Sequence, residues 1–302
     1  MHQSGQQDNR IEQRYDENCR MRLDGSRRAR SLAALWLVSL WFGQSAAWAT
    51  DYQFVGPFWA DWSVAANWSP GGGPPNSFFD SVTIDNAASV NIRNVYTIGN
   101  IDLSGGSFLH TAGGRIHVAQ DTELTKTSDV PVLLSVSDDG THVVDFDTDQ
   151  LRINDGAWLR MRDGHMDIDK RLNVDPESRI YGSGLIRFTG NTANPFALNG
   201  TLEVENDSIL SNGLTLFNAG SGVFDLDGFD ATRSHIIVTS GSTLSVDGPV
   251  GDAFNGQMDI AGGNAVFLPV WSLGAENFWG HRGQLNMDGG LTIASSCCTG
   301  HF

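Results

Sequence analysis

Four ionisable residues at alternate positions are the strongest candidates for chemistry in this sequence. Small or apolar residues separate them, and they are Asp163, His165, Asp167 and Asp169. On a β-strand this spacing places one imidazole and three carboxylates on the same side. Such a row could bind a hard cation or serve acid–base catalysis. The alternative is a strand whose outer side is polar because it meets water, and the lack of a defined ligand loop favours this alternative.

A second acidic row stands at Asp145, Asp147 and Asp149. Like charges two residues apart repel each other on a strand, and Ca²⁺ could relieve that repulsion because it takes several oxygen ligands at once. The segment 225–230 is also rich in Asp, but it lacks the spacing and the closing Glu of an EF-hand. The sequence therefore assigns no cofactor, and calcium is compatible with it without being specified.

Catalytic signatures are absent. The sequence contains no G-x-S-x-G, H-E-x-x-H, P-loop or C-x-x-C motif. Rows of carboxylates on stacked strands do serve polysaccharide lyases and glycoside hydrolases, so a carbohydrate-active enzyme stays open as an alternative. We assign no catalytic residue.

Aromatic residues crowd into a Trp-, Gly- and Pro-rich segment at 50–85, where Trp59, Trp62 and Trp68 could stack on sugar rings. Such a surface would make the chain a carbohydrate-binding module. The alternative is an aromatic cap that covers the first strands of a repeating fold, because an open end would expose both core and unpaired strand edge. Aromatic residues serve packing first, which favours the cap.

A secretory leader is predicted at residues 1–49. Three arginines (Arg27, Arg28 and Arg30) precede the apolar run 32–42, and Ala47-Trp48-Ala49 has the small residues of a cleavage site. The run is shorter than the roughly 20 residues that span a bilayer. We expect cleavage near Ala49 and an extracellular or cell-surface protein, translated from Met1 or Met21.

The residues after Ala49 are strongly acidic. They hold 12 Lys and Arg against 30 Asp and Glu, a formal charge of −18. Nucleic acid carries negative charge, so it is excluded as a partner. No later segment is apolar enough to span a membrane, which leaves polysaccharide or other cell-surface components as the expected partners.

Aliphatic residues, which could form a core, alternate with polar residues along several short segments, and this alternation predicts an all-β protein. Examples are residues 81–85, 151–153, 171–175, 202–205, 223–227 and 243–247, where aliphatic and polar residues alternate. Turn pairs such as Asp155-Gly156 and Asp163-Gly164 separate such segments. Gly200, Gly256 and Gly283 each open a similar short pattern, and their spacing fits one or two coils of about 20–30 residues. This spacing favours a β-solenoid over 86–302, with a β-sandwich or jelly roll as the alternative.

The opening of the acidic part resembles a known group. The residues that carry the resemblance are Trp62-Ser-Val-Ala-Ala-Asn-Trp68, Gly71-Gly-Gly-Pro-Pro75 and Asp80-Ser-Val-Thr-Ile-Asp85. They are similar to the start of exported bacterial autotransporter-like or haemagglutinin-like β-helix surface proteins, over residues 60–120. The resemblance implies a right-handed parallel β-helix and a non-catalytic role in adhesion or as an extracellular scaffold. The sequence departs from larger members in lacking a C-terminal translocator or sorting signal, as a chain truncated at its C-terminus would.

Overall fold

The computed structural model describes residues 49–302 except 138–144, 192, 194–195, 206–212, 222, 227–233, 251–253, 271–283, 296–298 and 302. The predicted leader therefore lies outside the described residues except for its last residue, Ala49. The described chain is all-β, as predicted, with 22 strands and one short 3-10 helix, η2 (Ala65–Asn67). Among these residues, no helix has both the length and the apolar character needed to cross a membrane.

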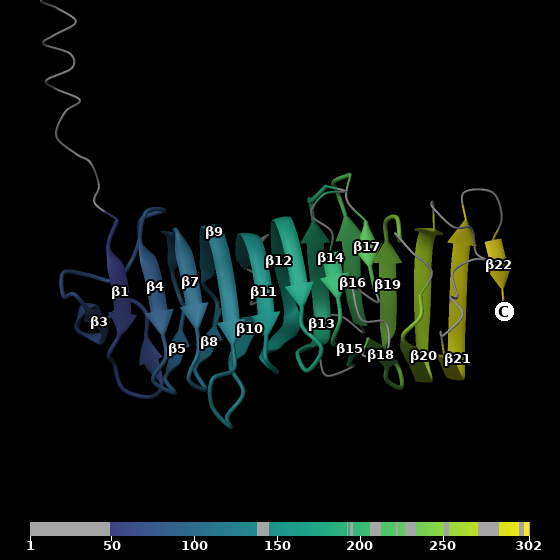
Figure 1. The fold of residues 1–302 in the computed structure, drawn as a ribbon, viewed down its shortest axis with the longest axis horizontal. Helices are drawn as coiled ribbons and strands as arrows, with labels where there is room; N and C mark the ends of the chain where they lie inside the picture. The colour runs from purple at the N-terminus through teal and green to yellow at the C-terminus, as the bar shows by residue number, and fades with distance from the viewer. Residues whose placement is uncertain are drawn as a thin grey trace, which may run out of the picture. The chain divides into compact units, whose positions relative to one another are not determined.

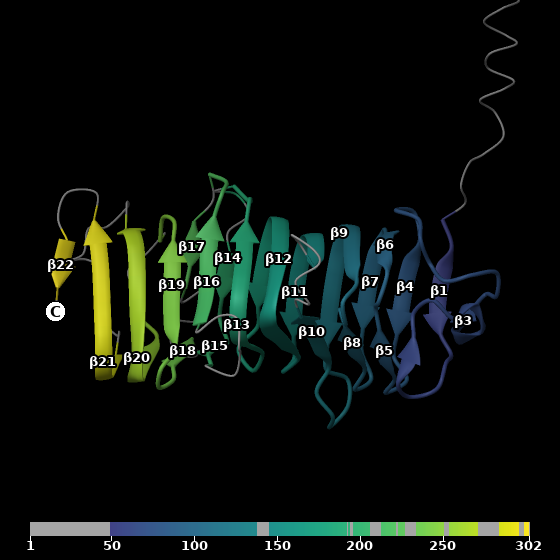
Figure 2. The same ribbon diagram turned by 180° about the vertical axis from the view of Figure 1, so that it is seen from behind.

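Nearly all the strands pair in parallel, in three series that we call faces 1, 2 and 3 (Figures 1 and 2). Face 1 consists of β1 (Asp51–Phe54), β4 (Ser81–Ile84), β7 (Asn100–Leu103), β9 (Arg115–Thr125), β11 (Phe146–Asn154), β12 (Trp158–Val174), β14 (Phe196–Leu198) and β17 (Phe224–Asp225). Face 2 consists of β2 (Ala60–Asp61), β5 (Ser89–Asn91), β8 (Phe108–His110), β10 (Leu133–Ser137), β12, β13 (Arg179–Phe188), β15 (Thr201–Val204), β18 (His235–Val238), β20 (Gln257–Val270) and β21 (Gln284–Ser295). Face 3 consists of β6 (Val95–Ile98), β9, β11, β12, β13, β16 (Gly213–Asn218), β19 (Thr243–Asp247), β20 and β21.

Two short strands pair antiparallel. β3 (Trp68–Ser69) pairs with β1, and β22 (Thr299–His301) pairs with β21. Every other pairing of the described strands is parallel. This arrangement differs from the antiparallel sheets of the β-sandwich or jelly roll that the sequence left open.

Alternation along each strand builds the core, because every second residue points inward. On face 2, Leu159, Ile180 and Leu202 pair side by side on successive strands, and all three are fully buried. Long rows of such aliphatic neighbours, each covered by the strand before and the strand after, form one continuous hydrophobic core.

The predicted turn at Asp163-Gly164 is wrong, because the chain continues there as strand. β12 runs for 17 residues and contributes 158–162 to face 2, 164–168 to face 3 and 171–174 to face 1. A register shift between Arg162 and Gly164 marks the first corner, where Asp163 adopts φ 57°. A β-bulge thus bends one long strand where the sequence suggested two short ones.

Two of the three candidate tryptophans belong to the core. Trp62 is fully buried and Trp68 is 2% exposed, and their rings meet edge to face at 4.6 Å between centroids. The Trp62 indole Nε1 donates a hydrogen bond to the Pro75 carbonyl at 3.1 Å, and the Trp68 Nε1 donates to the Trp62 carbonyl at 2.8 Å. Trp68 also packs against Phe54 of β1, at 5.1 Å between centroids.

Candidate functional site

The predicted row from Asp163 to Asp169 is divided among three places. Asp163 lies at the corner between faces 2 and 3, whereas His165 and Asp167 lie on face 3. A second register shift follows Ile168, so Asp169 stands at the corner toward face 1, where Thr189 Oγ1 donates a hydrogen bond to its carboxylate at 2.8 Å. The bends of β12 therefore separate residues that simple alternation places together.

Asp147 and Asp167 do come together, since they are direct partners on β11 and β12. Each carboxylate is engaged by one histidine and one arginine. His117 Nδ1 lies 2.9 Å from Asp147 and Arg115 lies 3.6 Å from it. The corresponding groups at Asp167 are His165 Nε2 at 3.0 Å and Arg187 at 3.3 Å.

The other two acids of the second row also have local partners. Asp145 is buried, and its carboxylate accepts a hydrogen bond from the His165 backbone N–H at 2.9 Å. The Asp149 carboxylate forms an ion pair with Lys170. The acidic row of the sequence is thus a ladder of ion pairs and hydrogen bonds between neighbouring strands.

The pKa of Asp167 shows how strongly this ladder holds its charge. Burial alone would raise the pKa of the carboxyl, but the hydrogen bond and charge of His165, followed by Arg187, outweigh burial and lower the pKa below its usual value. A general acid needs a raised pKa near the working pH, so Asp167 is held in the form that cannot donate a proton. The ladder is suited to structure more than to acid catalysis.

No metal centre emerges among the weak candidates. Within the part of the chain that the structure describes, no three His, Cys, Asp or Glu side chains form a group that could hold a metal ion. The carboxylates of Asp147, Asp149 and Asp167 instead form ion pairs with arginine, lysine and histidine side chains.

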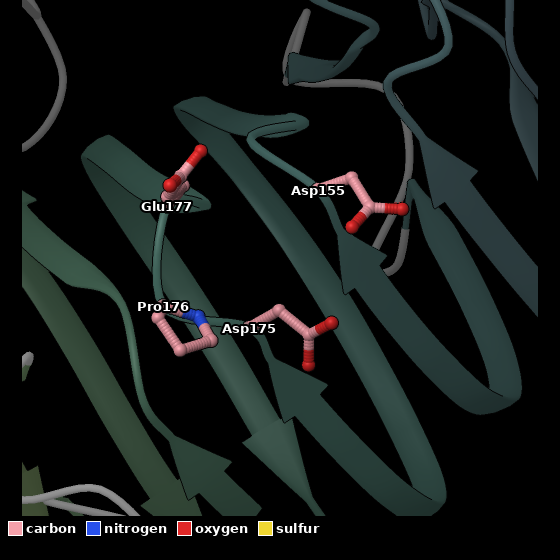
Figure 3. Close-up of a pocket in the computed structure, with 4 residues that line it drawn as sticks. All are labelled: Asp155, Asp175, Pro176 and Glu177. Atoms are coloured by element: carbon pink, nitrogen blue, oxygen red, sulfur yellow. The ribbon is translucent and has the colours of Figure 1, made fainter.

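Two shallow acidic hollows lie away from this ladder. One measures about 220 Å³ and is lined by Asp155, Asp175, Pro176 and Glu177, on the turns that follow β11 and β12 (Figure 3). The second measures about 300 Å³ on face 1 and includes Asp102, Glu123 and Arg152. Burial, then the charges of Glu123 and Asp85, raise the pKa of Asp102.

Comparison of the chain with protein-family models, with curated proteins and with solved structures finds no match. The family resemblance of residues 60–120 therefore remains a prediction that rests on those residues alone.

Trp59 differs from the two buried tryptophans, whose ring faces are closed to any sugar. Its side chain is 63% exposed, and its ring stacks on the His110 imidazole of β8 at 5.8 Å between centroids and 16° between planes. Its backbone adopts φ 60°, which is a true outlier for a bulky residue. Phe58, which is 57% exposed, meets the Trp59 ring edge to face.

Face 2 carries further outward aromatic and basic residues that the sequence did not single out. Trp158 and Tyr181 meet edge to face at 6.1 Å between ring centroids. The guanidinium groups of Arg160 and Arg179 lie 5.9 and 4.9 Å from the Tyr181 ring centroid. We call the outward group Trp59, Phe108, His110, Trp158, Arg160, Arg179 and Tyr181 the Trp158 surface.

The Trp158 surface is continuous because a strand with smaller outward residues lies in its middle. Ser135 of β10 pairs with His110 on one side and Arg160 on the other, and it is only 4% exposed. Leu133, in the same way, pairs with Phe108 and Trp158 and is 9% exposed. The larger side chains of the two strands beside β10 therefore cover Leu133 and Ser135, and together they form one surface.

The surroundings of His110 favour its neutral form. Burial, followed by the positive charge of Arg160, lowers the pKa of His110. The imidazole is therefore neutral at pH 7, and it presents a flat, uncharged ring beneath Trp59. The sequence did carry a signal for this surface. Trp158 and Arg160 alternate with Leu159 and Met161, which are buried, so alternation alone predicts that Trp158 and Arg160 point outward.

Proposed function

We propose that the parallel strands are the coils of a right-handed parallel β-helix. Each face advances by one strand per coil of roughly 20–30 residues. Parallel strands in one sheet are joined by right-handed connections in nearly all proteins, which supports the right-handed form. Long rows such as Leu159, Ile180 and Leu202 supply the continuous core that such a fold needs.

Residues 50–85 act in this proposal as an aromatic N-terminal cap. The buried Trp62 and Trp68 cover the first strands, where Phe54 is fully buried. The last strand of face 2 is less well covered than the first strands. Leu285 and Met287 of β21 are 37% and 45% exposed, although their partners on β20 are buried. Covering the first coil is what a repeating fold needs at its end.

The function that the geometry supports best is a non-catalytic exported scaffold with a surface or adhesive role. The single observation that carries it is the unbroken series of ten parallel strands on face 2, with outward side chains in regular rows. The acidic ladder on face 3 is paired, which argues for structure over catalysis. The basic and apolar leader before Ala49 supports export.

Expression of the complete chain in a bacterial host, followed by N-terminal sequencing of the exported material, tests this function. We expect the exported chain to begin near Thr50, because the A-x-A site ends at Ala49. Exported protein that still carries residues 32–42 would contradict the predicted cleavage, and protein found only inside the cell would contradict export. Replacement of Ala47 and Ala49 by Arg serves as the control, since it should block processing.

The enzyme alternative is tested on the same material. A scaffold should release no new reducing ends or unsaturated sugars from polysaccharides. If products appeared and the Asp147→Asn and Asp167→Asn variants abolished them, the ladder would be a catalytic pair and the non-catalytic role would be wrong.

A further inference from the structure

We propose that the Trp158 surface binds a linear neutral polysaccharide, laid along the direction in which the strands stack. This inference rests on the proposed exported scaffold, and it names what that scaffold would hold. The face combines the exposed Trp59 indole and several partly buried rings with polar groups, which is the combination that sugars recognise, because their C–H faces stack on aromatic rings and their hydroxyls hydrogen-bond.

The conformation of Trp59 is the first observation that supports a ligand. A large indole is 63% exposed, and its backbone adopts the left-handed φ of 60°. Both features cost free energy, and backbone strain of this kind concentrates at binding and active sites. Core packing does not account for the strain, because the ring lies outside on His110.

The spacing of the rings is the second observation. Phe108 and His110 are on β8, and Trp158 is two strands further along face 2, on β12. Neighbouring strands lie about 4.8 Å apart, so Trp158 lies roughly 10 Å from Phe108 along the face. Tyr181 follows one strand later. Rings spread over several strands fit a polymer with ring-shaped units better than a compact ligand.

The polar groups decide in favour of a neutral ligand. Arg179 forms ion pairs with Glu203 and Glu205 beside the rings, so N–H donors and carboxylate acceptors stand next to one another. Sugar hydroxyls both donate and accept, which suits this mixture. The charge of −18 after Ala49 repels anionic polymers.

Affinity electrophoresis of the purified protein tests the proposal. Gels would contain soluble neutral β-glucan, xylan or galactomannan, with anionic alginate as the comparison. We expect retardation by at least one neutral polymer and none by alginate. Trp59→Ala and Trp158→Ala should each weaken that binding about tenfold or more, as the loss of one good ring contact would. Trp158→Phe, which keeps a flat ring, should retain most of it.

Phe217→Ala is the matched control, because Phe217 is an exposed ring on β16 of face 3. It should leave binding unchanged, and the thermal midpoints of all variants show that they are folded. No retardation by any neutral polymer, retardation by alginate alone, or equal loss in Phe217→Ala would each overturn the proposal. If the protein is exported but binds no glycan, the polysaccharide-binding inference is wrong and the exported scaffold is not affected. If it binds glycan but is not exported, the proposed exported scaffold is wrong and the binding inference is not affected.

Discussion

Replacing Trp68 by Ala should lower the free energy of unfolding by about 3–5 kcal/mol. A buried Trp lost to Ala forfeits its burial and leaves a cavity, which accounts for that range. Trp68 is 2% exposed, packs against Phe54 and Trp62, and donates its indole N–H to the Trp62 carbonyl. The loss is measured as a shift of the urea midpoint.

Trp59→Ala is the control, since it removes the same side chain from an exposed position a few residues away. It should change the free energy of unfolding by less than about 1 kcal/mol, as exposed substitutions do. If Trp68→Ala were as mild as Trp59→Ala, the stability of the first strands would not depend on the buried aromatic residues beside them.

Gly182→Ala should destabilise the protein by about 2–4 kcal/mol, because backbone strain and forced overpacking each cost roughly 1–3 kcal/mol. Gly182 adopts φ 109°, which L residues rarely reach, and a Cβ built there would lie 1.9 Å from the Met161 carbonyl oxygen on β12. The neighbouring strands β12 and β13 are too close at this point for any side chain. The loss is measured as a lowered thermal midpoint.

Gly71→Ala provides the comparison, because nothing lies within 4 Å of a Cβ at that position. Its effect on stability, measured in the same way, should stay within about 0.5 kcal/mol of zero. Equal midpoints for the two variants would show that β12 and β13 are not in close contact at Gly182.

Much of the strand content could be predicted from the sequence because alternation is a local property. Residues 81–85, 202–205 and 243–247 lie at β4, β15 and β19 with their aliphatic members buried. The weak sequence repeat that begins with Gly200 also corresponds to a repeat in the structure. Its aliphatic members Leu202, Met258 and Leu285 fall in one register on face 2, and the longer gap between the first two contains one additional strand of that face, β18.

The candidate site could not be predicted in the same way, because its partners come from other strands. Asp147 and Asp167 lie on different strands, and their arginines, Arg115 and Arg187, lie on two further strands, β9 and β13. Alternation shows which residues point outward but not which of them face each other across strands. The bulge at Asp163 also shifts the pattern by one residue, which local alternation cannot show.

The same reason explains the Trp158 surface. His110, Arg160 and Tyr181 stand far apart in the sequence, and only the register of face 2 brings them together. The sequence instead offered Trp59, Trp62 and Trp68 as possible stacking residues while favouring a packing role for them, and two of the three do bury their rings in the core.

The strands of face 2 stack in sequence order, and distances from pulsed electron spin resonance measure this order. The three native cysteines would be replaced by Ser, and spin labels placed at Asn91 together with either Tyr181 or Ile237. These residues occupy one outward row, four and six strands apart. At about 4.8 Å per strand we expect about 19 Å between the backbone positions of Asn91 and Tyr181, and about 29 Å between those of Asn91 and Ile237. Equal distances for the two pairs, or a shorter distance to Ile237, would contradict it.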